Sequence, residues 1–273
     1  MKEAWTREGV KVWTPIVLDL ASDPYIMLSE AEKHRYFSEQ GYLVVRGIVP
    51  RDICGKVIET YQKTCKLAEL AKRSAEGESD FVGNDHLVRE IFLRHGANHP
   101  YQTLEEACKT SVNHPALREE VSNLLGPDFA SDAFIYFDSS RGSRTHRDID
   151  PYQPGDFVGA WIALRDISHE SARFFVCPKS HMLEIPRFVV DLFHRDTAKI
   201  PRPQLRKNGY QRYSSGEYER AISKFAVDQG LEFRAPIINA GDVVFFNNKL
   251  IHGSLFVADP HFPRDSIITF YSR

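Results

Sequence analysis

The sequence predicts a mainly β fold with flanking helices. Helical patterns occupy most of the chain up to residue 125, and from Ala130 onward the apolar residues gather in short runs of strand length. Turn-rich segments separate these runs, as they do between strands packed in sheets. Helices that precede a series of short strands favour two packed sheets with the helices outside them. We therefore expect a double-stranded β-helix, the jelly-roll arrangement that cupins also have, and we find no internal repeat.

At 273 residues the chain could hold two domains of typical size, but sandwiches and barrels often reach this length as one domain. We expect a single domain over residues 1–273. An insert from about residue 182 to 230 interrupts the strand pattern.

Capping residues place the helix boundaries. Ser29 and Glu32 have capping-box spacing, and Gly41 can end the helix that they begin. Thr103 and Glu106 repeat that spacing ahead of a later helix. The expected helices are Leu28–Gln40, Arg51–Lys72, Leu104–Ser111 and Pro115–Leu125. The expected strands are Tyr42–Val45, Ala133–Phe137, Phe157–Leu164, Val243–Phe246 and Ser266–Tyr271.

Composition excludes several classes of function. A formal net charge of −2 and a pI near 6.6 argue against broad nucleic-acid binding. The longest apolar run, Phe157–Leu164, is far too short to span a bilayer, and the first residues lack the core of a signal peptide. Cysteines without Cys-x-x-Cys spacing indicate reduced thiols, and we expect a cytoplasmic enzyme that binds neither nucleic acid nor membrane. These cysteines are Cys54, Cys65, Cys108 and Cys177.

Two distant segments offer two imidazoles and one carboxylate. His146 and Asp148 lie two residues apart, so on an extended chain their side chains point the same way. His252 could complete the set. Two histidines and one carboxylate on one face of an ion, with the other positions open, suit non-heme Fe(II) oxygenases.

A His-x-Asp tripeptide alone is weak evidence, and the chain contains a second copy at His194–Asp196. The first copy lies between two strand-like runs, whereas the second lies in a charged, Pro- and Arg-rich stretch that we interpret as a solvated face. Both copies spell the His-Arg-Asp of a kinase catalytic loop, which needs an Asn five positions after the Asp. Gln153 and Pro201 occupy those positions, so we exclude a kinase.

A second motif surrounds His252. A Gly-Asp turn at residues 241–242 opens the apolar run Val243–Phe246, and His252 follows it beside a Gly. Arg264 comes twelve residues later, ahead of the last strand. Arginine is the side chain best shaped to hold a carboxylate through two parallel hydrogen bonds. A metal triad with a carboxylate clamp implies a dicarboxylate cosubstrate.

The chain resembles the phytanoyl-CoA dioxygenase family of Fe(II)- and 2-oxoglutarate-dependent oxygenases, from about residue 32 to the end. The stretches that carry the resemblance are Tyr36–Gly47, Thr145–Asp148, Trp161–His181 and Gly241–Arg264. The resemblance implies that His146, Asp148 and His252 are the iron ligands. It also implies that Arg264 and Ser254 hold the distal carboxylate of 2-oxoglutarate. Trp161 is a candidate wall of the cosubstrate pocket, beside the more common role of a buried core Trp.

The implied activity follows from these cofactors. Fe(II) would be the metal, 2-oxoglutarate and O₂ the cosubstrates, and succinate and CO₂ the products. The expected reaction is hydroxylation of an unactivated C–H bond in a small-molecule metabolite or natural-product intermediate. Related halogenases have a small residue in place of the carboxylate, so Asp148 indicates an oxidation rather than a halogenation. Desaturation, epoxidation, ring closure and epimerisation stay open as outcomes.

The chain departs from the family pattern in one block. It reads Glu170–Arg173 where a Gly turn is usual, and Pro178–His181 contains Lys179 where the family has Pro-Gly-Ser-His. The loop geometry there is not predicted. For His181 we expect a structural role in holding a turn.

The segment Arg187–Arg212 is strongly basic, with seven Lys and Arg residues against two Asp. It is either a solvated charged face or a lid whose cations attract an anionic group of the substrate. The basic residues are Arg187, Arg195, Lys199, Arg202, Arg206, Lys207 and Arg212.

Two alternatives remain open from the sequence. A cupin-like metal enzyme could use the same triad without 2-oxoglutarate, but it leaves Arg264 unexplained. A noncatalytic jelly-roll binding protein would make the triad accidental.

Overall fold

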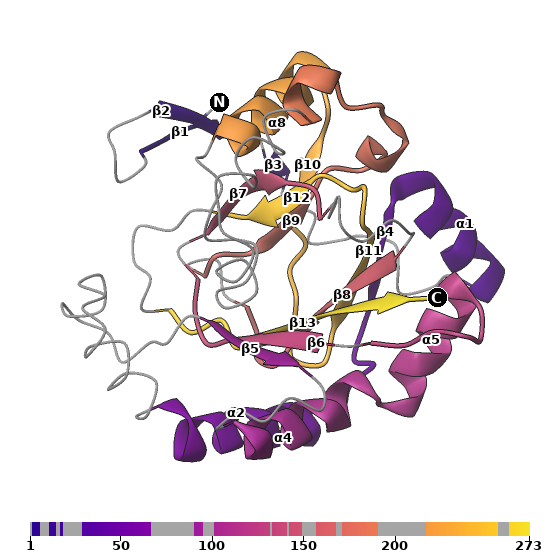
Figure 1. Ribbon diagram of the computed structural model, residues 1–273, viewed down its shortest axis with the longest axis vertical. Coiled ribbons are helices and arrows are strands. Elements are labelled where there is room, and N and C mark those ends of the chain that lie inside the picture. Colours follow the sequence, from indigo (N-terminus) through magenta and orange to yellow (C-terminus); the bar gives the residue numbers. More distant parts are fainter. Residues whose placement is uncertain are drawn as a thin grey trace.

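The computed structural model describes residues 2–5, 11–14, 17–18, 29–66, 90–94, 101–131, 133–140, 142–148, 157–167, 171–190, 217–255 and 262–273. Within them, two sheets face each other and helices lie outside both (Figure 1). This arrangement confirms the predicted jelly roll with flanking helices. No helix in these ranges is both long enough and apolar enough to cross a membrane.

The larger sheet contains all five strands expected from the sequence. Its strands are β4 (Tyr42–Val45), β5 (Glu90–Arg94), β6 (Ala133–Phe137), β8 (Phe157–Ala163), β11 (Val243–Asn247) and β13 (Ser266–Ser272). They pair in the order β4-β11-β8-β13-β6-β5, antiparallel throughout. The bounds of β8, β11 and β13 differ from the expected ones by a single residue.

The smaller sheet consists of shorter strands. They are β3 (Val17–Leu18), β7 (Ser143–His146), β9 (Phe174–Val176), β10 (Phe233–Arg234) and β12 (His252–Ser254). They pair in the order β3-β10-β9-β12-β7, with only the β3–β10 pair parallel. Two further strands, β1 (Lys2–Trp5) and β2 (Lys11–Thr14), pair with each other.

Successive residues of a strand reach different cores, because side chains alternate between the faces of a sheet. In β11, Val243 and Phe245 pack against the helices outside the larger sheet, whereas Val244 and Phe246 lie between the two sheets. Phe174 of β9 enters the same interior from the smaller sheet. The inner core therefore joins both sheets, and any residue directed into it is withdrawn from water.

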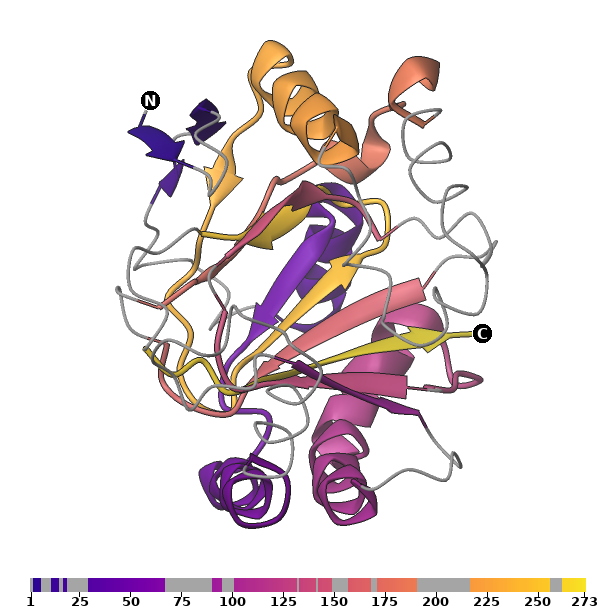
Figure 2. The same cartoon turned by 60° about the vertical axis from the view of Figure 1, so that its left-hand side comes forward.

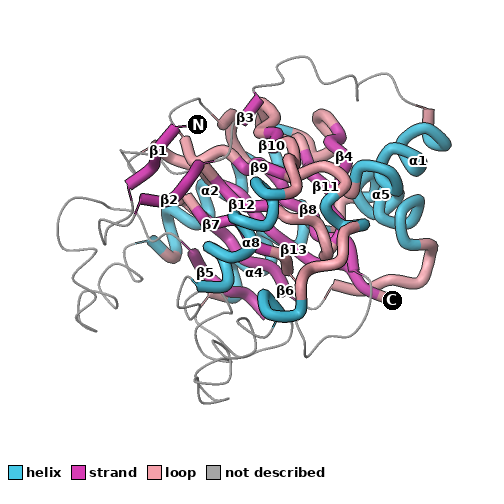
Figure 3. The backbone as a smooth tube through the Cα atoms, turned by 90° about the horizontal axis from the view of Figure 1, so that it is seen from above, coloured by secondary structure: helices cyan, strands magenta, loops and turns pink. Residues whose placement is uncertain are grey.

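Helices cover the outer faces of both sheets (Figure 2). The helices α1 (Glu30–Gln40), α2 (Arg51–Thr64), α4 (Gln102–Val112) and α5 (Pro115–Leu125) lie against the larger sheet. The smaller sheet is covered by α8 (Glu217–Asp228), which lies above β7 and β12 in the view from the top (Figure 3). Tyr218, Ile222 and Ala226 of α8 are buried in one cluster with Phe175 and Phe233 of the smaller sheet. Thus α8 forms the end of the expected insert, whereas residues 191–216, with most of the basic side chains and the second His-Arg-Asp, lie outside the described residues.

The helix predictions have mixed outcomes. Before α1, the Ser29 backbone N–H donates to Glu32 Oε2 at 2.8 Å, as the capping box predicts, and α5 has the expected bounds. The capping box expected at Thr103 is wrong, because α4 begins at Gln102 after Tyr101 and Thr103 already lies inside the helix. The described part of the second helix ends at Thr64, and residues 67–72 lie outside the described ranges.

Two turns require unusual backbone conformations. Gly241 has φ +88°, and a Cβ atom there would overlap the carbonyl oxygen of Val49, so only glycine allows this close approach. Lys179 has φ 65°, the left-handed conformation that glycine adopts without strain. The position where the family usually has glycine thus keeps a left-handed turn although its residue is lysine.

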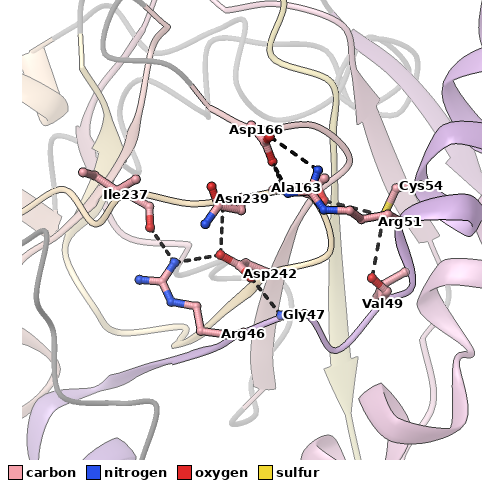
Figure 4. A network of polar contacts seen from close by, with 11 residues as sticks. Arg46, Gly47, Val49, Arg51, Cys54, Ala163, Asp166, Ile237, Asn239 and Asp242 are labelled. Atoms are coloured by element: carbon pink, nitrogen blue, oxygen red, sulfur yellow. Dashed lines mark hydrogen bonds and ion pairs between the residues drawn. The ribbon is translucent and has the colours of Figure 1, made fainter.

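The Asp242 carboxylate joins the segment after β4 to the turn before β11, at one end of the larger sheet (Figure 4). Its carboxylate is almost completely buried. The Oδ1 atom accepts a hydrogen bond from the Gly47 N–H at 2.8 Å. The Oδ2 atom accepts hydrogen bonds from the Asn239 N–H at 2.8 Å and from the Arg46 guanidinium at 2.7 Å. The Gly-Asp turn therefore connects the end of β4 to the start of β11.

We expect Asp242→Ala to lower the free energy of unfolding by about 3 kcal/mol, because it leaves two backbone N–H groups without their acceptor and removes the ion pair with Arg46. Denaturant unfolding measures the change. Asp166→Ala is the matched control, since this exposed carboxylate accepts the Ala240 N–H at 2.8 Å and pairs with Arg51 at 2.7 Å. The control should lose about 1 kcal/mol or less. Equal losses in both variants would contradict the assignment.

Candidate active site

The pairing of β7 with β12 brings His146, Asp148 and His252 together. His252 begins β12 and lies directly opposite His146 at the end of β7, with ring centroids 4.4 Å apart. Asp148 follows two residues after His146. Its Oδ1 lies 3.6 Å from His146 Nε2, and its Oδ2 lies 3.4 Å from His252 Nε2. One ligand atom from each residue lies within 4.8 Å of the others, so the three could hold one metal ion.

His252 is prepared to act as a neutral ligand. Its side chain is 2% exposed, and the rings of Phe174 and Phe246 pack against it at centroid distances of 5.4 and 4.6 Å. Burial lowers the pKa of His252 to about 4, although the Asp148 carboxylate opposes the shift. Nδ1 lies 3.0 Å from the Leu250 carbonyl oxygen, an acceptor that keeps the ring proton on Nδ1 and leaves the Nε2 lone pair free.

Asp148 supplies a test of whether a metal fits here. Its Oδ2 is buried and makes no hydrogen bond to any described residue. A buried carboxylate oxygen without a donor is costly unless a cation is bound to it. The arrangement of two imidazole nitrogens around this carboxylate is therefore suited to a divalent ion.

A second polar centre lies at the start of β13. The Arg264 side chain is 4% exposed, and one of its terminal nitrogens donates to the Ser254 hydroxyl at 2.8 Å. Its Nε has no hydrogen-bond partner among the described residues. Burial lowers the pKa of Arg264 to about 9, with no carboxylate among the described residues to oppose the shift. Such a guanidinium can receive an anion.

Aromatic rings connect the two centres. The Arg264 guanidinium lies 5.0 Å from the centre of the Trp161 ring. Trp161 stacks on Phe174 at 5.6 Å, and Phe174 stacks in turn on His252. Ser254 and His252 are two residues apart on β12, about 7 Å along a strand. The centres therefore share one face of β12, at a separation suited to a short dicarboxylate.

Two buried carboxylates support the backbone around Arg264, and sequence reasoning did not identify them. The Arg264 N–H donates to the Asp138 carbonyl at 2.9 Å, and the Tyr61 hydroxyl donates to the Asp138 carboxylate at 2.5 Å. The Tyr136 hydroxyl donates to Asp265, whose pKa is raised by burial. In the sequence both aspartates look like ordinary turn residues, and the hydroxyl donors come from distant elements.

His181 lies apart from the triad and has a structural contact. Its Nε2 is 3.0 Å from the Ser38 carbonyl oxygen near the end of α1. Arg147, between two of the candidate ligands, was also missed. On an extended chain Arg147 points away from His146 and Asp148, so nothing in the sequence indicated its burial. The Arg147 side chain is nevertheless only 5% exposed.

Comparison with known proteins gives the family. The sequence profile of the phytanoyl-CoA dioxygenase (PhyH) family matches residues 37–257. A probable phytanoyl-CoA dioxygenase of Caenorhabditis elegans is 22% identical over 253 residues, covering 82% of this chain and 69% of that protein. The 1-deoxypentalenic acid 11-beta-hydroxylase of Streptomyces exfoliatus is also 22% identical, over 82% of this chain and 72% of its own length.

A solved structure shares the fold. The non-heme alpha-ketoglutarate-dependent epimerase SnoN from nogalamycin biosynthesis aligns with a TM-score of 0.53 at 16% identity, covering 89% of this chain and 80% of that one. The family profile spans most of the chain, from α1 to the residues that follow β12. The chain therefore belongs to the phytanoyl-CoA dioxygenase family and is a 2-oxoglutarate-dependent dioxygenase that uses Fe(II), 2-oxoglutarate and O₂.

Proposed function

We propose that this enzyme hydroxylates an unactivated C–H bond of a small-molecule metabolite or natural-product intermediate and releases succinate and CO₂. The observation that carries the proposal is the juxtaposition of a His-Asp-His cluster and a buried guanidinium along one strand. A metal ion and a dicarboxylate that chelates it need these two centres together.

In this proposal His146, Asp148 and His252 hold Fe(II). The Asp148 oxygen that has no hydrogen-bond partner among the described residues supports the assignment, because a divalent ion would supply the missing positive charge. The neutral His252 ring supports it as well, because a metal binds only an unprotonated ring nitrogen. Three protein ligands on one side leave the other positions open. Bound Fe(II) with 2-oxoglutarate and O₂ supplies the oxidation that no side chain can perform.

Arg264 and Ser254 hold the far carboxylate of 2-oxoglutarate. The buried guanidinium loses hydration without gaining a counter-charge among the described residues, and a bound carboxylate would offset that cost. The Ser254 hydroxyl orients one nitrogen of the guanidinium. Trp161 lies beside the guanidinium and forms one wall of the pocket. Phe174, Phe246 and Trp161 keep water away from the reacting groups.

Hydroxylation of a small molecule is the reaction that we favour. Asp148 occupies the position at which a halogenase needs space for chloride. The Streptomyces exfoliatus relative is named as the hydroxylase of an acid, which supports a natural-product intermediate that carries an anionic group. The cupin-like and noncatalytic alternatives leave the buried guanidinium without a role.

We expect Asp148→Ala to abolish the weak visible charge-transfer band that forms when Fe(II) and then 2-oxoglutarate are added to the apoprotein without oxygen. The substitution removes the one anionic ligand, and coupled succinate formation should disappear with the band. Asp166→Ala removes an exposed carboxylate elsewhere and should leave both unchanged. A wild-type band in Asp148→Ala would refute the triad.

We expect Arg264→Met to have opposite effects on cosubstrate binding and on stability. The 2-oxoglutarate concentration that half-saturates the band should rise roughly 10- to 100-fold, because a charged hydrogen-bonding partner is lost. The ligand-free protein should become more stable by about 1–2 kcal/mol in denaturant unfolding, because a buried, unpaired cation is replaced by an apolar side chain.

Arg173→Met is the matched control for this substitution. Arg173 is also buried, and its guanidinium likewise makes a hydrogen bond, to the Ala235 carbonyl at 3.2 Å. Its loss should leave the 2-oxoglutarate requirement near that of the wild type. An unchanged requirement in Arg264→Met would contradict the clamp.

A further inference from the structure

Ser180 touches both chain segments that bear the candidate metal ligands. It begins a short 3₁₀ turn, η3 (Ser180–Met182), and is completely buried. Its hydroxyl accepts the Ile251 N–H at 2.8 Å, immediately before His252. Its backbone carbonyl accepts a hydrogen bond from the guanidinium of Arg147, which lies between His146 and Asp148. Ser180 is therefore hydrogen-bonded to Ile251 and Arg147, which are the sequence neighbours of the three candidate ligands.

The burial of the Arg147 guanidinium costs free energy, because the cation loses its hydration. The same terminal nitrogen also donates to the Leu183 carbonyl at 3.0 Å, and the backbone N–H donates to the Tyr218 hydroxyl at 3.4 Å. The Nε atom has no partner among the described residues. Hydrogen bonds to carbonyl groups alone do not offset the desolvation of a buried cation as an ion pair would. An apolar residue would be enough for packing at this position. We therefore look for the role of Arg147 in the two carbonyl groups that its guanidinium reaches.

The turn that receives Arg147 is itself fixed to the body of the fold. The Lys179 N–H donates to the Gln40 carbonyl at 2.9 Å, at the end of α1, and Lys179 has the left-handed backbone already described. The Cys177 N–H donates to the Ile251 carbonyl at 2.8 Å, and the Ser180 N–H donates to the Cys177 carbonyl at 3.2 Å. A side chain bonded to this turn is therefore held against α1 and β12 together.

The sheet needs such support at this point. The pairing of β12 with β7 has a register shift between His252 and Ser254, so the ladder is irregular beside the ligands. An irregular ladder specifies the separation of its strands less firmly than a regular one.

We propose that Arg147 and Ser180 are positioning residues of the metal centre. They set the separation between the His146–Asp148 segment and His252 before the metal binds. The inference rests on the proposed metal-binding role of the triad and adds to it the residues that keep its geometry.

The test is Co(II) binding to the apoprotein, followed through the visible ligand-field spectrum in the absence of 2-oxoglutarate. Arg147→Met keeps the length of the side chain and removes both carbonyl contacts. Ser180→Ala removes only the hydroxyl and, as the smaller change, carries the test if Arg147→Met does not fold. Tyr271→Phe is the matched control, because it deletes a buried hydroxyl that donates to the Val112 carbonyl at 2.7 Å, away from the triad.

Each positioning variant should bind Co(II) roughly 10- to 100-fold more weakly than the wild type, with altered band positions or intensities. Arg147→Lys, which keeps a charged donor, should recover part of the affinity. Tyr271→Phe should lower the unfolding free energy of the apoprotein and leave Co(II) affinity and spectrum unchanged. That difference separates positioning of the ligands from general stability.

Wild-type affinity and spectrum in both Arg147→Met and Ser180→Ala would overturn the inference and leave the proposed function standing. Failure of the wild-type protein to bind Co(II) would overturn the proposed function first, and the inference with it.

Discussion

The pairing of β12 with β7 is the constraint on which the candidate site depends. It sets His252 opposite His146 although the two residues are far apart in the sequence. A slip of one residue in this pairing would turn the His252 side chain to the other face of the sheet, toward α8. The geometry of the site thus depends first on backbone hydrogen bonds between these strands. The flanking helices contribute by holding the sheets in place.

Around that pairing the protein buries charge that its described residues do not neutralise. The Nε atom of Arg264 and one oxygen of Asp148 lie in the interior without the hydrogen-bond partners that buried groups normally have, and no described carboxylate pairs with the guanidinium. Their hydration is lost when the chain folds, and ligands that bring the missing charges would recover part of that free energy. Folding and cofactor binding are linked in this way. The ligand-free site lowers the stability of the fold, and bound metal and cosubstrate would restore part of it.

The sequence predicts the larger sheet better than the smaller one, for a physical reason. Runs such as Phe157–Ala163 are buried on both faces and therefore read as continuous apolar strands. In contrast, β9 and β12 have three residues each, and β12 contains His, Gly and Ser, so no strand pattern reveals them. The candidate triad could be selected because residue type and spacing carry its chemistry. Arg147 and Ser180 could not, because their importance lies in contacts that only the folded chain creates.

Each candidate residue of the site lies on a strand or within two residues of a strand end. His146, Trp161, His252 and Ser254 are strand residues, while Asp148 follows β7 and Arg264 precedes β13. The long connections between strands supply none of them. Insertions, deletions and replacements in those connections can therefore accumulate without altering the oxidising centre. This separation makes the scaffold evolvable, since a lineage can acquire a new substrate by remodelling its loops while it inherits the reaction unchanged.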